Sequence, residues 1–197
     1  MRIGLLLLFV SVNSFAQTAV QCGIEDPIAA AKVGATIKNF SQVAPGIYRG
    51  SRPREPADFA FLKAQGIKTI LSLEAMPWNV CPESDRVEGQ FVFLNVGIVA
   101  SPFEPDENHV SRAVQVLMDP SVRRPIFVHC AAGRDRTSLI VGLYRISAEG
   151  CSPANAWKEM RGFGINQGFF LHGLRTSFIR QSGWNPDKPA ANADGTH

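Results

Sequence analysis

A chain of 197 residues, of which 45% are hydrophobic and 19% charged, is long enough for one domain with a proper core and too short for two ordinary domains. This composition excludes the collagen-like and intrinsically disordered classes. The net charge of +3 permits an anionic ligand, but the only basic cluster is Arg123–Arg124, which argues against a nucleic-acid-binding protein.

The N-terminal residues have the three regions of a secretory signal peptide. Arg2 supplies a positive charge, residues 3–12 form an apolar run, and residues 14–16 (SFA) fit a small-x-small cleavage site. The apolar run is shorter than the roughly 20 residues that cross a bilayer. We therefore expect residues 1–16 to be removed, and a periplasmic or secreted protein without a membrane anchor.

Four cysteines follow this segment, at positions 22, 81, 130 and 151. An even number in an oxidising compartment suggests disulfides. The sequence around Cys130 favours a free, reactive thiol there. We therefore expect a Cys22–Cys81 bridge, with Cys151 as a small buried residue.

Runs of β-branched and aromatic residues predict four strands. They cover residues 43–53, 67–74, 91–99 and 125–129. The first lies beside a Pro-Gly turn, and the last, PIFVH, is short and central. A loop or short irregular helix at residues 76–89 separates the second strand from the third.

Helical spacing of apolar residues, with proline near starts and glycine at ends, predicts five helices. They cover residues 55–66, 107–118, 137–150, 152–164 and 166–184. Two internal glycines weaken the last one, and residues 185–197 have the composition of a disordered tail. Strands that alternate with helices predict one α/β domain at residues 17–184, whose mostly parallel sheet is flanked by helices.

The stretch HCAAGRDRT, from His129 to Thr137, joins the central strand to the N-terminus of a helix. In such sheets ligands bind at the carboxyl ends of strands, where Cys130 lies. The backbone N–H groups of residues 131–136 have no intrahelical partners, and the helix dipole adds positive potential, so this loop is an anion cradle. Gly133 supplies the conformational freedom of a tight loop.

Side chains of this loop suit phosphate chemistry. The guanidinium of Arg136 can bind two phosphate oxygens, and the field of the loop should lower the pKa of Cys130. Thr137 can donate its hydroxyl to the thiolate, and His129, buried on the strand, can order the base of the loop. Each residue alone has an ordinary structural explanation, but their combination at this spacing favours a functional one.

HCAAGRDRT matches the H-C-x5-R-[ST] signature of the cysteine-dependent protein tyrosine phosphatase superfamily. With GIYRGSRP, FAFLKAQGIKTILSLE and the later helices, the chain resembles small atypical dual-specificity phosphatases of plants and fungi, and bacterial phytase-like members that hydrolyse inositol polyphosphates. The resemblance implies that Cys130 is the nucleophile, Arg136 the phosphate clamp and Thr137 the leaving-group hydroxyl. It also implies a phosphocysteine intermediate, no metal or other cofactor, and a cradle formed by Ala131, Ala132, Gly133, Arg134 and Asp135.

The chain departs from the family pattern at two places. Ser138 replaces the usual glycine after the Ser/Thr of the signature. The general-acid aspartate of the family normally follows the preceding strand, where this chain has Ala100 and Ser101.

Three carboxylates are candidates for the missing acid. Glu104 and Asp106 lie in the loop SPFEPDE, which we favour, and Asp135 lies in the cradle, as in bacterial relatives that read G-K-D-R-T. Each has an alternative role. Asp106 is a natural helix N-cap, Asp135 can pair with Arg134 or favour a helix start, and Glu104 can be solvated.

Positive charge near the loop indicates the substrate class. Arg134 lies beside Arg136, and further cations, each of which can equally be a surface charge, are Arg52, Arg54, Lys63, Arg86 and Arg161. We expect a monomer that acts on a small, highly phosphorylated molecule such as an inositol polyphosphate. The alternative is a phosphotyrosine protein, for which candidate wall residues are Trp78, Phe103, Phe163 and Phe169.

Two other classes are possible for such a loop. One is a phosphate-binding module without turnover, which the presence of both Cys130 and Arg136 disfavours. The other is sulfur transfer by a rhodanese-like loop, which the Arg-Thr closure disfavours.

Overall fold

The computed structural model describes residues 35–75, 89–166 and 168–188. Its sheet has the order β1-β2-β5-β3-β4. The strands are β1 (Ser41–Ala44), β2 (Ile47–Ser51), β3 (Thr69–Glu74), β4 (Val92–Ile98) and β5 (Ile126–Cys130). Strand β1 pairs with β2 in the antiparallel sense, and every other neighbouring pair is parallel. The predicted α/β domain with a mostly parallel sheet is therefore confirmed.

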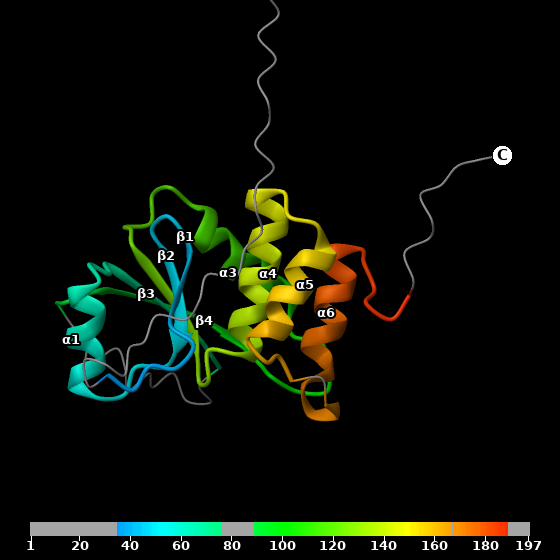
Figure 1. Cartoon of the computed structure of the whole chain (residues 1–197), viewed down its shortest axis with the longest axis horizontal. Coiled ribbons are helices and arrows are strands. Elements are labelled where there is room, and N and C mark those ends of the chain that lie inside the picture. The colour runs from blue at the N-terminus through cyan, green and yellow to red at the C-terminus, as the bar shows by residue number, and fades with distance from the viewer. Residues whose placement is uncertain (1–34, 76–88, 167, 189–197) are drawn as a thin grey trace, which may run out of the picture.

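Helices cover both faces of the sheet (Figure 1). They are α1 (Pro56–Ala64), α3 (Glu107–Met118), α4 (Asp135–Glu149), α5 (Pro153–Gly162), the 3-10 helix η2 (Phe169–Leu171) and α6 (His172–Ser182). Helix α1 lies on one face, and α4, α5 and α6 form a layer on the other. In parallel strands the carboxyl ends meet at one edge, so the ends of β2, β3 and β5 define a single site.

Three predicted elements differ in detail. The first predicted strand is a hairpin, because Pro45 and Gly46, the latter with φ of +77°, turn the chain between β1 and β2. Helix α4 begins at Asp135, two residues before the predicted start. The last predicted helix is divided into η2 and α6.

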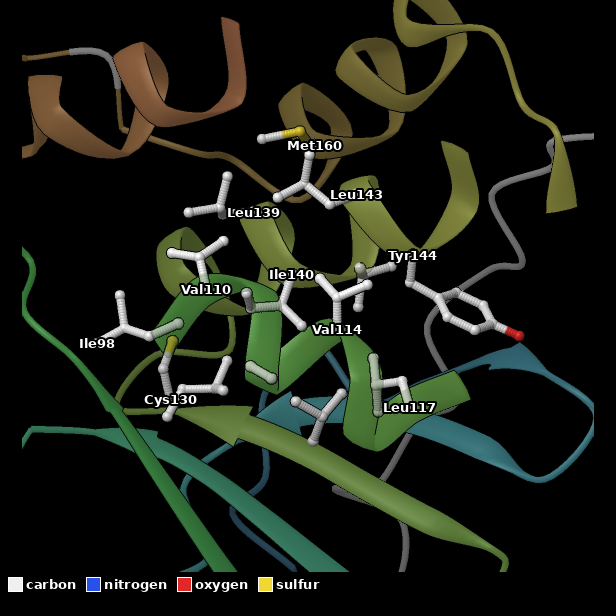
Figure 2. Packing of buried hydrophobic residues seen from close by; sticks show 14 of the residues in the cluster. Ile98, Val110, Val114, Leu117, Cys130, Leu139, Ile140, Leu143, Tyr144 and Met160 are labelled. Carbon is white, nitrogen blue, oxygen red and sulfur yellow. The ribbon is translucent and has the colours of Figure 1, made fainter. Parts of the chain in front are cut away.

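Alternate residues of the central strand face two different cores, as the pleat requires. Phe127 packs with Phe40, whose ring also meets Phe61 of α1. Val128 and Cys130 belong to the core beneath α3 and α4. Figure 2 shows Cys130 in this second core, among apolar side chains that include Ile98 and Val110. Cys130, at the end of β5, is therefore held by packing against α3 and α4.

The expected signal peptide at residues 1–16, most of the loop at 76–89 and residues 189–197 of the expected tail lie outside the described residues. The first part of that tail, residues 185–188, follows α6, and Asp187 there pairs with Arg175. Among the described residues, no helix has both the length and the apolar character needed to cross a membrane.

The cysteine expectations need one correction. Cys130 is free, as predicted. Cys151 is buried but disulfide-bonded, so the expectation of a free thiol there is wrong. The expected Cys22–Cys81 bridge lies outside the described residues.

Candidate active site

The candidate site is the loop of residues 131–134, which connects β5 to α4. Cys130 is the last residue of β5, directly opposite Ser51 of β2 in the parallel register. Helix α4 begins at Asp135, so the loop delivers its backbone N–H groups to the positive end of that helix. The structure thus brings together the thiol, the loop and Arg136 as the sequence predicts.

Gly133 fixes the position of this loop. It has φ of +66°, in the left-handed region that glycine adopts without strain. A Cβ atom at this position would lie 2.3 Å from the carbonyl carbon of Gly50 and 2.5 Å from the backbone nitrogen of Ser51. The loop therefore rests directly on the backbone of β2, and a larger residue would push it away.

Two side chains missed by the sequence analysis hold the same loop through its carbonyl groups. Nδ2 of Asn39 donates to the Ala132 carbonyl at 3.0 Å, and Nη2 of Arg49 donates to the Gly133 carbonyl at 3.0 Å. Both carbonyls are therefore bound by side chains of the protein, which fixes the loop in place. A charged residue at a buried position of a short strand was the signal for Arg49.

Arg49 also explains the departure from the family pattern at Ser138. Its Nη2 donates to Oγ of Ser138 at 2.8 Å, an acceptor that glycine cannot supply. The guanidinium is 1% exposed and lies 3.6 Å from the centre of the Phe163 ring. Burial lowers the pKa of Arg49 to about 10, while the negative charges of Glu159 and Cys130 oppose that shift. Arg49 is therefore a buried cation at neutral pH.

The pKa of Cys130 lies below its ordinary value. Burial opposes ionisation of the thiol, but hydrogen bonds from the hydroxyl and backbone N–H of Thr137, the positive charge of Arg136 and the backbone N–H of Arg134 outweigh it. The Thr137 hydroxyl has no nitrogen or oxygen partner among the described residues, so its proton is available to the sulfur. These groups favour a thiolate, which is the nucleophilic form.

Arg136 lies in the first turn of α4, and its guanidinium reaches the carboxyl ends of the neighbouring strands. Nη1 is 3.3 Å from the carbonyl oxygen of Leu73 and 3.4 Å from that of Ile98. Both contacts are long for hydrogen bonds. They orient the side chain at the edge of the sheet, where phosphate oxygens can replace them.

The three candidate acids occupy different environments. Asp106 is exposed and caps α3, accepting from the backbone N–H of Asn108 at 2.8 Å. Glu104 is not simply solvated, because Oε2 accepts from Nε of Arg180 at 2.7 Å. Their loop is also fastened to α6, where the N–H of Gly173 donates to the Ser101 carbonyl at 3.3 Å.

Asp135, the third candidate, is nearly buried. Its Oδ1 accepts from the backbone N–H of Asn166 at 2.7 Å, and Oδ2 lies 3.4 Å from Nε of Arg134. The alternative roles foreseen for Asp106 and Asp135 are therefore both present. The capping bond of Asp106 uses Oδ1, so Oδ2 of this carboxylate is not part of it.

The remaining predicted residues are dispersed. His129 is fully buried, as expected, with its ring 5.6 Å from that of Phe127. Phe103 and Phe169 are exposed, whereas Phe163 packs against Arg49. Lys63 and Arg161 are exposed on α1 and α5, and Trp78 and Arg86 lie outside the described residues. Within the described ranges, no group of three or more His, Cys, Asp or Glu side chains is arranged to hold a metal ion.

The low pKa of Cys130 can be tested by removing the largest favourable contribution. We expect Thr137→Val to raise the pKa of the thiol, so that the thiolate forms only at higher pH. The measurement is the rate of alkylation by iodoacetamide as a function of pH. The control is Thr176→Val, whose hydroxyl donates to the His172 carbonyl on α6. An unchanged titration in Thr137→Val would contradict the role of its hydroxyl.

Relatives in sequence are phosphatases. Inositol diphosphatase DSP4 of Arabidopsis thaliana is 38% identical over 112 residues, which are 54% of this chain and 54% of the relative. Dual specificity protein phosphatase TpbA of Pseudomonas aeruginosa is 27% identical over 129 residues, 64% of this chain and 56% of the relative. The chain thus spans little more than half the length of these curated relatives.

The fold is also that of solved phosphatase structures. The core catalytic domain of the PP-IP phosphatase Siw14 of Saccharomyces cerevisiae superposes with a TM-score of 0.61 at 22% identity, covering 76% of this chain and 87% of that one. The family model of the tyrosine phosphatase family matches residues 35–181, a range that includes the whole Cys130 loop. The chain therefore belongs to the tyrosine phosphatase family.

Proposed function

We propose that the protein is a phosphomonoester hydrolase that acts through a phosphocysteine intermediate, preferentially on myo-inositol polyphosphates. The observation that carries the proposal is the joint placement of a free, low-pKa Cys130 and the guanidinium of Arg136 at the loop between β5 and α4. A tetrahedral dianion in this loop would have its phosphorus next to the sulfur and its oxygens bound by the N–H groups and Arg136.

The reaction then has two steps. The Cys130 thiolate attacks phosphorus, the bond to the ester oxygen breaks, and the leaving oxygen takes a proton from a carboxylic acid. Water next attacks the phosphocysteine and gives a proton to the carboxylate formed in the first step, the P–S bond breaks, and inorganic phosphate leaves. The Thr137 hydroxyl stabilises the thiolate as a leaving group in this second step.

The names of the relatives support the choice of substrate. DSP4 and DSP3 of Arabidopsis thaliana and SIW14 of Saccharomyces cerevisiae are described as inositol diphosphatases. The alternative is a protein tyrosine or dual-specificity phosphatase, which the similarity to TpbA supports. A binding module without turnover is disfavoured by the reactive thiol, which binding alone does not require.

A substrate panel tests the proposed reaction. We expect the purified protein to release phosphate from inositol hexakisphosphate and an aryl phosphate, to act less well on a phosphotyrosine peptide, and not to consume thiosulfate. Cys130→Ser should abolish phosphate release, and Arg136→Lys should reduce kcat by about 10²–10³-fold. The control is Arg123→Lys, at the amino end of β5. Phosphate release by Cys130→Ser at the parent rate would refute the mechanism.

We further propose that the loop of residues 104–106 supplies the general acid, with Asp135 as the second candidate. Asn at position 106 would keep the helix cap, so its effect on turnover reports on the proton. Loss of the acid should reduce turnover of an alkyl phosphate by about 10²–10⁴-fold and spare an aryl phosphate, whose leaving group is less basic.

The measurement compares Asp106→Asn, Glu104→Gln and Asp135→Asn on both phosphates. Asp119→Asn, an exposed aspartate at the other end of α3, is the matched control. If each of the three variants keeps alkyl-phosphate turnover within about tenfold of the parent, neither candidate group supplies the acid.

We also propose that the mature protein is a monomer exported from the cytoplasm. The signal-like residues 1–16 and the disulfide at Cys151 support export, because disulfides persist in oxidising compartments. In a bacterial host, the periplasmic protein should begin at Gln17 by intact mass and be monomeric by light scattering. Leu6→Arg/Leu8→Arg, which interrupts the apolar run, should keep the chain unprocessed in the cytoplasm. An unprocessed parent chain in the cytoplasm would count against export.

A further inference from the structure

A cavity of about 460 Å³ adjoins the Cys130 loop. In the part of the chain that the structure describes, its lining consists of Thr36, Lys38, Ser51, Arg52, Arg54, Glu55, Ala131 and Ala132. Two of them, Ala131 and Ala132, belong to the loop itself, so the cavity and the candidate active site share a wall. The others come from the segment before β1, from the end of β2 and from the connection between β2 and α1.

The lining of the cavity is predominantly cationic. Among the described lining residues, Lys38, Arg52 and Arg54 contribute three positive charges, against the one carboxylate of Glu55. Arg52 also pairs with Glu74 at the end of β3, with 2.6 Å between Nη1 and Oε2. The side chains of Lys38 and Arg54 are exposed to solvent at the cavity, where an anion can reach them.

Buried groups hold the walls of this cavity in place. Asp58 of α1 is fully buried, and its carboxylate accepts from the backbone N–H groups of Thr36 at 2.5 Å, Arg54 at 2.7 Å and Glu55 at 3.0 Å. Burial opposes ionisation of Asp58, but these three N–H groups and the Thr36 hydroxyl outweigh it and lower its pKa. One carboxylate therefore joins the two segments that carry the cations.

A second set of bonds ties the cavity to the Cys130 loop. The backbone N–H of Lys38 donates to Oγ of Ser51 at 2.8 Å, and the N–H of Ser51 donates to the Lys38 carbonyl at 2.8 Å. The next residue, Asn39, holds the Ala132 carbonyl at 3.0 Å. The position of Lys38 relative to the loop is thus set by backbone geometry, as a preorganised binding site requires.

We propose that this cavity is a second anion subsite, which binds a phosphate group of the substrate other than the one transferred to Cys130. The inference rests on the proposed phosphatase function and names the feature that selects polyphosphorylated molecules. A monophosphate ester fills only the Cys130 loop, whereas a polyphosphate also places a charged group against Lys38 and Arg54. The subsite therefore adds affinity for polyphosphates and leaves the chemistry at Cys130 unchanged.

The test removes the two exposed cations, in Lys38→Gln/Arg54→Gln. We expect the KM for inositol hexakisphosphate to rise at least about tenfold, while kcat/KM for the aryl phosphate stays within about twofold of the parent. The matched control is Lys68→Gln/Arg123→Gln, which removes one lysine and one arginine at the amino end of the sheet, the edge opposite Cys130. This control should leave both substrates unaffected.

Binding without turnover gives an independent measurement. In a Cys130→Ser background, titration calorimetry should show a weaker Kd for inositol hexakisphosphate in the double variant, by about tenfold or more, and no such change in the control pair. Lys38→Gln alone should show a smaller loss in the same direction, which preserves the test if the double variant folds poorly.

The outcomes separate this subsite from the phosphatase function. If the double variant keeps the parent KM and Kd for inositol hexakisphosphate, there is no subsite, whatever the parent hydrolyses. If the parent hydrolyses the aryl phosphate without any preference for the polyphosphate, the subsite is also refuted and the phosphatase function stands. If the parent hydrolyses neither, the proposed function itself fails.

Discussion

The close approach of Gly133 to the backbone of Gly50 and Ser51 is the constraint on which the candidate site depends. Because a Cβ atom would not fit at this point, the loop can lie directly on the end of β2. This contact places the loop's amides between a strand end and a helix start, where their donors have no intrahelical partners. It also brings β2 close enough for Arg49 to donate a hydrogen bond to the Gly133 carbonyl.

Electrostatics follow from that arrangement. A thiolate at Cys130 is buried, which by itself is unfavourable, and so is the guanidinium of Arg49. The negative charge of Cys130 is one of the groups that keep Arg49 protonated. Buried charges of opposite sign support each other, and here Ser138 and Gly133 supply acceptors for Nη2 of Arg49, whereas its Nε and Nη1 have no hydrogen-bond partner among the described residues. Ser138, which replaces the family's glycine, thus helps to position Arg49, which in turn holds the Cys130 loop.

At this edge of the sheet, the backbone of the site is held by buried groups, whereas the cations that would meet a substrate are exposed. The Cys130 loop and the walls of the adjoining cavity are fixed by buried groups, Arg49 and Asp58, whereas Lys38 and Arg54 are exposed. The loop of residues 101–106 is attached to a different element, α6, through Gly173 and Arg180. A fixed backbone with exposed charged side chains suits a site that holds one phosphate tightly and accommodates the others.

Local pattern by itself determined the alternation of strands and helices, the parallel sheet and the strand–loop–helix around Cys130. These features depend on residues close together in the chain, and HCAAGRDRT contains the thiol, the glycine and the arginine within nine positions. Composition also favoured a free Cys130, since charged loop residues and an apolar strand flank it.

Only the tertiary structure decided which distant residues complete the site. Arg49 meets Gly133 and Ser138 across 84 and 89 positions, and Asn39 meets Ala132 across 93. The cavity likewise combines three separate segments, and the pairing of Arg180 with Glu104 and the disulfide at Cys151 depend on folding. Such contacts leave no periodicity or spacing in a single sequence, because they are created when remote segments pack against one another.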